Sequence, residues 1–183
     1  MNRVYFLKIL IINTLYSPFK VGGAEVSVQI LAETLVSQGH QVRVVTLHDG
    51  RGVYENIING VEVVYYALKN IYWPFSEKRE NILKRLLWHV IDTYNPLMRR
   101  VIEKEIVSFN PDVVHTNNLA GFSVSAWYAV KKYGIRLVHT TRDYYLFHPN
   151  CTLFFNGRNR DVNSLSVRLW SFLKKKSSKK VDE

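Results

Sequence analysis

Residues 20–26 read Lys20-Val21-Gly22-Gly23-Ala24-Glu25-Val26, and they stand between an apolar run at 7–13 and an amphipathic stretch at 25–38. The run predicts a buried strand, and the stretch has apolar residues at the spacing of one helix face, namely Val26, Ile30, Leu31, Leu35 and Val36. A glycine pair at such a turn leaves the backbone open to a ligand, because glycine has no Cβ. The N–H groups that begin a helix favour anions. This stretch therefore predicts a site for a phosphorylated small molecule.

Strand-like and helix-like stretches alternate along the rest of the chain. We expect strands at 7–13, 42–47, 54–58, 61–66, 113–115 and 135–140, and helices at 25–38, 83–109, 122–133 and 164–176. Asn59-Gly60 is a strong hairpin signal between two of the strands. Pro96 predicts a break or kink in the long helical stretch. The alternation predicts an α/β fold with a Rossmann-like, mostly parallel sheet and helices on both faces.

Length and composition limit the class of protein. The chain has 183 residues, which suits one domain with a real core, so we treat 1–183 as a single domain with a basic tail at 168–183. The lone Cys151 excludes an internal disulfide and indicates a reducing, cytoplasmic compartment. Arg3 and the apolar run after it resemble a signal peptide, but Lys8 interrupts the run and no cleavage pattern follows, which favours a first strand. No run approaches the roughly 20 apolar residues of a membrane span.

The net charge of +10 is concentrated near the end of the chain. Residues 168–180 contain no acid, and their cations are Arg168, Lys174, Lys175, Lys176, Lys179 and Lys180. The simplest interpretation is a solvated helix end whose lysines complement the helix dipole. The alternative is a tail that binds an anionic membrane surface, at the inner face of the membrane. Nucleic acid is not expected, because aromatic residues are not interleaved with the lysines.

Polar clusters follow two further predicted strands. One is His115-Thr116-Asn117-Asn118, and the other is Thr140-Thr141-Arg142-Asp143-Tyr144-Tyr145. The carboxyl ends of parallel strands meet at one edge of a sheet, where ligands bind, so these clusters are expected to lie beside the glycine turn. Their side chains suit hydrogen bonds to sugar hydroxyl groups.

Structural alternatives remain open for these clusters. His115 is at least as well explained as a buried, hydrogen-bonded histidine. Arg142 and Asp143 either pair with each other or hold phosphate and hydroxyl groups separately. Tyr144 and Tyr145 either line an acceptor pocket or pack.

Several kinds of chemistry are disfavoured. The glycine turn lacks the three-glycine dinucleotide fingerprint and the Gly-Lys-Ser/Thr ending of a phosphate loop. Cys151 has no neighbouring ligand set, so neither a metal nor another cofactor is expected. Two functions that are not enzymatic stay in view. They are a non-catalytic Rossmann-like module that binds a partner or membrane through its basic tail, and a nucleic-acid binder suggested by charge alone.

The clusters together resemble the N-terminal domain of family 4 retaining glycosyltransferases, from about residue 8 to the end. The matching segments are Gly22-Gly23-Ala24-Glu25, Leu31-Ala32 with Leu35, Gly39-His40-Gln41-Val42 with Val44-Val45-Thr46, Asn110-Pro111-Asp112-Val113-Val114-His115-Thr116-Asn117-Asn118-Leu119 and Asp143-Tyr144-Tyr145-Leu146-Phe147-His148-Pro149. The resemblance implies one lobe of the two-lobed GT-B architecture. It also implies metal-free transfer of a sugar, with retention, from a nucleotide-sugar to a glycan or lipid-linked acceptor. In this family the N-terminal lobe binds mainly the acceptor, and its glycine turn approaches the donor diphosphate.

The resemblance also implies site residues. Those expected to bind donor or acceptor are Gly22, Gly23, Ala24, Glu25, Asn117, Asn118, Arg142, Asp143 and Tyr144. No catalytic base is assigned; the candidates are His115, Asn117 and Asp143. Asn117 stands where many relatives carry a histidine, and it bonds a hydroxyl but cannot share a proton as imidazole does. Arg142 likewise replaces a frequent histidine.

The resemblance further implies that a strand and a donor-binding lobe follow the helix expected at 164–176. We therefore expect residues 1–183 to lack the last strand of the lobe and to be inactive alone.

Overall fold

The computed structural model describes residues 6–19, 22–76, 80–149, 151–155 and 157–182. A six-stranded sheet has the order β3-β4-β2-β1-β5-β6. Its strands are β1 (Lys8–Ile12), β2 (Gln41–His48), β3 (Val53–Ile58), β4 (Val61–Ala67), β5 (Val113–Thr116) and β6 (Arg136–His139). Every neighbouring pair is parallel except β3 with β4, which confirms the mostly parallel sheet. A separate two-stranded hairpin, β7 (Phe154–Phe155) with β8 (Arg158–Asn159), was not expected.

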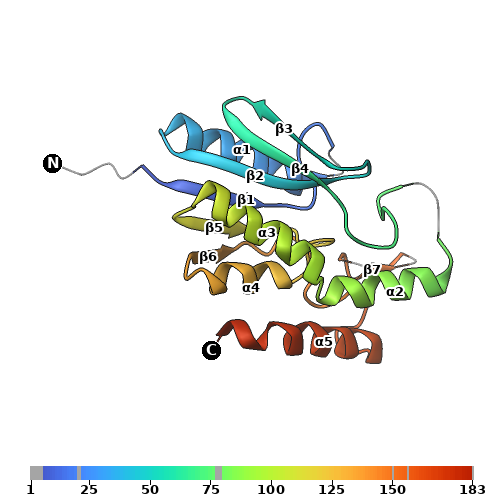
Figure 1. Ribbon diagram of the computed structural model, residues 1–183. Coiled ribbons are helices and arrows are strands. Elements are labelled where there is room, and N and C mark those ends of the chain that lie inside the picture. Colours follow the sequence, from blue (N-terminus) through green and yellow to red (C-terminus); the bar gives the residue numbers. More distant parts are fainter. Residues whose placement is uncertain (1–5, 20–21, 77–79, 150, 156, 183) are drawn as a thin grey trace.

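Helices cover both faces of the sheet, as predicted (Figure 1). They are α1 (Gly23–Ser37), α2 (Ile82–Thr93), α3 (Pro96–Phe109), α4 (Ser125–Lys132) and α5 (Leu165–Asp182). Val28 and Ala32 of α1 pack into one core cluster with the sheet. Side chains of α3 and α4 pack into the other, through residues such as Met98 and Ala126. Helix α5 lies outside α4, on the side away from the sheet (Figure 1).

The buried face of α1 differs from the predicted one. Val26 and Ile30 are 42% and 61% exposed, whereas Glu25, Val28 and Ala32 are buried. The helix begins at Gly23, and the Glu25 side chain turns back to the backbone of Gly22. Residues three and seven positions after Glu25 then share its inward face. The prediction was wrong for Val26 and Ile30, because it counted apolar residues and ignored the direction that the first turn imposes, whereas Leu35 and Val36 pack against the core as predicted.

Pro96 breaks the long helical stretch, as expected. Helix α2 ends at Thr93, and Pro96 opens α3 at a position where its missing N–H costs no hydrogen bond. The side chain of Asn95 caps α3 by accepting from Leu97 N–H at 3.1 Å and Met98 N–H at 3.2 Å. The apolar stripe of α2 faces solvent, while Trp88 and Asp92 face the body of the molecule.

The hairpin signal is also confirmed. Asn59 and Gly60 join β3 to β4 with φ values of 50° and 83°, as a tight hairpin turn requires.

Gly121 is a position where the fold itself requires glycine. Its φ is +89°, and a Cβ there would lie 2.6 Å from Cδ1 of Leu47 and 3.0 Å from Cδ1 of Leu68. We expect Gly121→Ala to lower the free energy of unfolding by about 1–3 kcal/mol, measured by urea denaturation. Gly134→Ala is the matched control, because Gly134 also has a positive φ, +65°, but a Cβ there meets nothing within 4 Å. Equal losses in the two variants would contradict the packing argument.

Candidate functional site

The segments that follow β1 and β5 are joined by hydrogen bonds at the carboxyl edge of the sheet. Asn117 N–H donates to the Ile12 carbonyl at 2.9 Å, and Thr14 N–H donates to the Asn118 carbonyl at 3.1 Å. The Asn13 side chain accepts from Asn118 N–H at 3.0 Å. Sequence reasoning missed these supporting roles of Asn13 and Thr14. Their signal is that both are polar residues directly after a buried strand.

The glycine turn has open space beside its backbone. Gly22 has φ −160°, an extended conformation that any residue adopts, and Gly23 is the first residue of α1. A Cβ on Gly23 would meet nothing within 4 Å, and one on Gly22 would lie 3.8 Å from Oε2 of Glu25. Both glycines are exposed. Neither conformation nor packing within the described chain requires glycine here, in contrast to Gly121.

The side chain of Glu25 forms a hydrogen bond with the backbone of this turn. Glu25 is 6% exposed, and its carboxylate accepts the Gly22 N–H at 2.8 Å, which is one half of a capping box because Gly22 has no side chain to complete it. The Gly22 N–H is therefore bonded within the protein and is not open to a ligand. Burial is the main cause that raises the pKa of Asp143, and the nearby Glu25 carboxylate raises it further. The glycine turn and the loop after β6 thus lie within electrostatic range of each other.

Two buried side-chain amide atoms at the strand edge have no hydrogen-bond partner among the described residues. Nε of Arg142 donates to Oδ1 of Asn117 at 2.8 Å, which joins the loops after β5 and β6. Within the part of the chain that the structure describes, Nδ2 of Asn117 and Oδ1 of Asn118 have no hydrogen-bond partner. A buried polar atom without a partner costs about 1–3 kcal/mol, so such atoms call for an explanation. A bound molecule with hydroxyl or phosphate oxygens would satisfy the Asn117 amide, and a hydroxyl would satisfy the Asn118 oxygen.

His115 is held in a hydrogen-bonded arrangement. Its Nε2 lies 2.8 Å from Oγ1 of Thr140, and its side chain is half-buried. Burial lowers the pKa of His115, and the charge of Arg142 lowers it further, so the imidazole is neutral at pH 7. This geometry agrees with the alternative of a satisfied histidine, and a catalytic role for His115 stays a prediction.

The loop after β6 separates its charged and aromatic residues. Oδ1 of Asp143 accepts the Tyr145 N–H at 2.9 Å, whereas Arg142 donates to Asn117, so the two have different partners. Tyr144 is exposed at the surface. Tyr145 is buried and donates its hydroxyl to the Asp92 carbonyl at 2.7 Å. Of the two tyrosines, Tyr145 packs and Tyr144 is free to line a binding surface.

Lys174 is not part of an exposed basic tail, and that prediction was wrong. Its side chain is 3% exposed, and Nζ donates to the Asp92 carbonyl at 3.0 Å and lies 3.7 Å from Oδ2 of Asp92. Nζ also lies 3.6 Å from the centre of the Tyr145 ring. The reason is helical spacing, because Lys174 follows the buried Val167 by seven residues and shares its inward face. The structure does not describe the side chain of Lys180, and the exposed cations of α5 are Arg168, Lys175, Lys176 and Lys179.

Two further observations concern the described residues only. Among them, no group of three or more His, Cys, Asp or Glu side chains could hold a metal ion. None of their helices has both the length and the hydropathy that a membrane span needs.

Burial raises the pKa of the Cys151 thiol to about 12, so this cysteine is protonated at pH 7.

Comparison with known proteins identifies the family. The model of Glycosyltransferase Family 4 matches residues 21–182. The chain belongs to glycosyltransferase family 4. A protein of Klebsiella pneumoniae described as an uncharacterized 42.6 kDa protein in cps region is 49% identical over 176 residues, which are 96% of this chain and 47% of that protein. The family 4 chain thus spans about half the length of this curated relative.

A solved structure, the C-terminal domain of a hydrogenase from Pyrococcus furiosus, has 16% sequence identity and a TM-score of 0.44, and it covers 76% of this chain and 95% of that domain. No functional argument follows from a likeness at this level. Membership of glycosyltransferase family 4 confirms the resemblance stated from the motifs. It agrees with a Rossmann-like lobe of the GT-B kind, while the roles of single side chains stay predictions.

Proposed function

We propose that this family 4 chain forms the acceptor-side lobe of an enzyme that transfers a sugar from a nucleotide-sugar to a glycan or lipid-linked acceptor, with retention. The observations that carry the proposal are the open space beside the glycine turn and two buried amide atoms, Nδ2 of Asn117 and Oδ1 of Asn118, that have no partner among the described residues. The matching family and the relative in a cps region support a place in polysaccharide biosynthesis. The lone cysteine supports a reducing, cytoplasmic compartment.

The proposed chemistry is a front-face transfer in which the acceptor hydroxyl attacks from the side that the diphosphate leaves. The N–H groups of Gly23 and Ala24, at the amino end of α1, would stabilise the leaving diphosphate, because the Gly22 N–H is already bonded to Glu25. Arg142 keeps further N–H groups for phosphate, since its bond to Asn117 uses Nε. No metal ion takes part in the proposed reaction.

Hydroxyl groups of the substrates would be held by the remaining polar side chains. Nδ2 of Asn117 would donate to a hydroxyl or phosphate oxygen, and Oδ1 of Asn118 would accept from a hydroxyl. Glu25 carries a buried carboxylate and Asp143 a half-buried one, and both would accept hydrogen bonds from sugar hydroxyl groups and would not face phosphate. Tyr144 would line the acceptor side. We assign no catalytic base.

Titration calorimetry with a panel of nucleotide-sugars tests the proposal. We expect residues 1–183 to bind donors weakly and to show no turnover alone, because transition-state stabilisation requires donor and acceptor to be held together. Adding a donor-binding lobe taken from a family 4 relative should produce transfer and tighten donor binding. No gain in either measurement would contradict the proposal and would favour a non-catalytic binding module.

A further inference from the structure

The outward side of α2 is an exposed apolar face. The exposed fractions are 79% for Ile82, 73% for Leu83, 48% for Leu86, 54% for Leu87 and 54% for Val90. The inward side of the helix is formed by Trp88 and Asp92, which are buried. Single exposed apolar residues are ordinary, but a contiguous face on one helix indicates an interaction surface.

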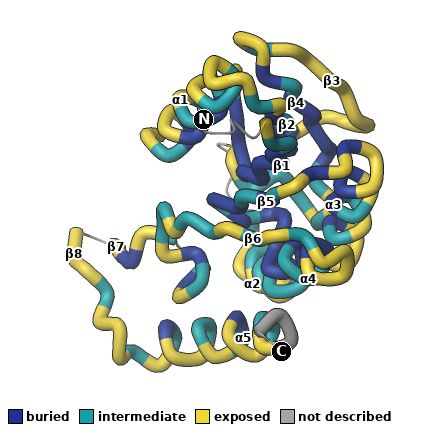
Figure 2. Tube along the Cα trace, turned by 90° about the vertical axis from the view of Figure 1, so that its left-hand side faces the viewer, coloured by how far each residue is buried: buried dark blue, intermediate teal, exposed yellow. Residues whose placement is uncertain are grey.

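Helix α5 also has an exposed apolar side. It runs beside α2, because the rings of His89 and Trp170 lie 6.0 Å apart and Lys174 bonds the Asp92 carbonyl. The exposed apolar residues of α5 are Leu165, Leu169 and Phe172. Figure 2 shows α5 at the edge of the molecule, with its exposed stretches mainly on the side away from the other elements. Both helices turn buried side chains inward and these apolar side chains outward. We call the eight exposed apolar residues of α2 and α5 the two-helix face.

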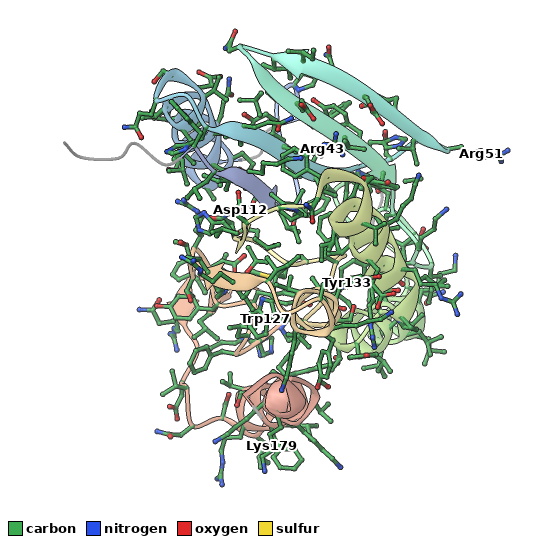
Figure 3. All side chains as sticks on the ribbon, turned by 60° about the vertical axis from the view of Figure 1, so that its left-hand side comes forward. Arg43, Arg51, Asp112, Trp127, Tyr133 and Lys179 are labelled. Atoms are coloured by element: carbon green, nitrogen blue, oxygen red, sulfur yellow. The ribbon has the colours of Figure 1, made fainter. Side chains whose placement is uncertain are left out.

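The charges around the two-helix face have one sign. On α5 the exposed cations are Arg168, Lys175, Lys176 and Lys179, and Figure 3 shows Lys179 on the outermost helix. On α2 the cations are Lys84, which pairs with Glu80 at 3.2 Å, and the half-buried Arg85. Among the described side chains of these two helices, Asp92 is the sole acid, and it is buried. The face therefore combines eight apolar side chains with exposed cations, most of them on α5.

We propose that the two-helix face binds an anionic membrane surface, with its apolar side chains at the boundary of the acyl chains and its cations among the head groups. An amphipathic surface with Lys and Arg at its border is what interfacial binding to anionic lipid requires. A second copy of the chain fits less well, because it would bring the same cations against each other. The binding is peripheral.

The position of the face is consistent with access to a lipid-linked molecule. The amino-terminal ends of α2 and α5 lie toward the same end of the molecule as the carboxyl end of β1 (Figure 1). A bilayer at this face would present lipid-borne groups beside the strand edge. The membrane proposal does not depend on sugar transfer, because its test measures binding to vesicles and not activity.

Vesicle flotation tests the proposal on the purified protein. We expect binding to vesicles of phosphatidylcholine with phosphatidylglycerol, little binding to phosphatidylcholine alone, and weakening as salt is raised. Leu83→Glu with Leu87→Glu should abolish binding, whereas Val107→Glu, at an exposed position of α3, should leave it unchanged. Lys175→Gln with Lys176→Gln should weaken it about thirtyfold. Arg100→Gln with Lys104→Gln on α3 is the matched charge control.

Three results would overturn the proposal. The first is that the protein binds neither kind of vesicle. The second is that the control variants on α3 lose as much binding as the variants on the two-helix face. The third is a dimer in light scattering that Leu83→Glu separates while vesicles are not bound, since the face would then join two copies. Circular dichroism of each variant shows that lost binding does not come from lost folding.

Discussion

Gly23→Val is expected to reduce the donor kcat/KM of the complete transferase at least about a hundredfold while the stability of the fold hardly changes. A Cβ at Gly23 meets nothing within 4 Å, so the valine side chain does not collide with the protein. It would instead fill the space in which the proposed diphosphate approaches the N–H groups at the start of α1. We expect the free energy of unfolding to stay within about 1 kcal/mol of wild type.

The comparison that makes this test specific is a series at one position. Gly23→Ala should have a smaller effect than Gly23→Val, because the loss grows with the volume that enters the space. Thr34→Val, at an exposed position three turns further along α1, changes a side chain away from the turn and should leave donor kinetics unchanged. Near-normal kinetics for Gly23→Val would remove the role assigned to the turn. A large loss of stability would instead show that glycine is structural here.

The order and type of the main elements were predictable from the sequence because local signals agree with the fold. The glycine at 60 and the proline at 96 act through backbone conformation, which is a local property, and both predictions are confirmed. Parallel strands buried on both sides also produce continuous apolar runs, such as the one in β1. Family 4 motifs then placed the loops that meet at the strand edge.

The direction of helix faces was less predictable. Apolar residues on α1, α2 and α5 lie on exposed as well as buried sides, so periodicity alone does not identify the side that packs. In α1 a buried Glu25 takes the place of an apolar residue, because its carboxylate caps the helix. In α5 a lysine at 174 takes such a place, because Asp92 lies opposite on α2. The bond of Glu25 to Gly22 is local, whereas the burial of Lys174 depends on a partner far away in the sequence, which no local pattern contains.

The meeting of three loops at the site was predictable from the sequence, but the hydrogen bonds that join these loops were not. The polar residues after β5 and β6 signalled a crevice, whereas the Arg142–Asn117 bond and the unsatisfied amide of Asn118 depend on the relative position of two loops. The supporting bonds from Asn13 and Thr14 likewise follow from the adjacency of β1 and β5 in the sheet.

Lys174→Met is expected to lower the free energy of unfolding by about 3–5 kcal/mol at pH 7, because it leaves the buried carboxylate of Asp92 without its cation. Lys175→Met is the matched control, since Lys175 is the next residue and is exposed, and it should change stability by less than about 0.5 kcal/mol. The double variant Asp92→Asn with Lys174→Met should recover part of the loss, because no charge is then buried. Chemical denaturation measures all three differences.

The pH dependence separates this pair from an ordinary packing contact. Burial raises the pKa of Asp92 from 3.8 to about 6, so the folded state holds this proton longer than the unfolded chain does, and the contribution of Asp92 to stability falls as pH rises from 4 to 6. Burial lowers the pKa of Lys174 from 10.5 to about 8, so its contribution rises again between pH 8 and pH 10.5.

The loss caused by Lys174→Met should therefore be larger at pH 7, where Asp92 is ionised in the wild type, than at pH 4, where the carboxyl is neutral and needs no cation. Unfolding curves of the two proteins at both pH values measure this difference. A loss that is the same at pH 4 and pH 7 would mean that the lysine stabilises α5 through its packing on Tyr145 and its bond to the Asp92 carbonyl, and not through the charge of the carboxylate.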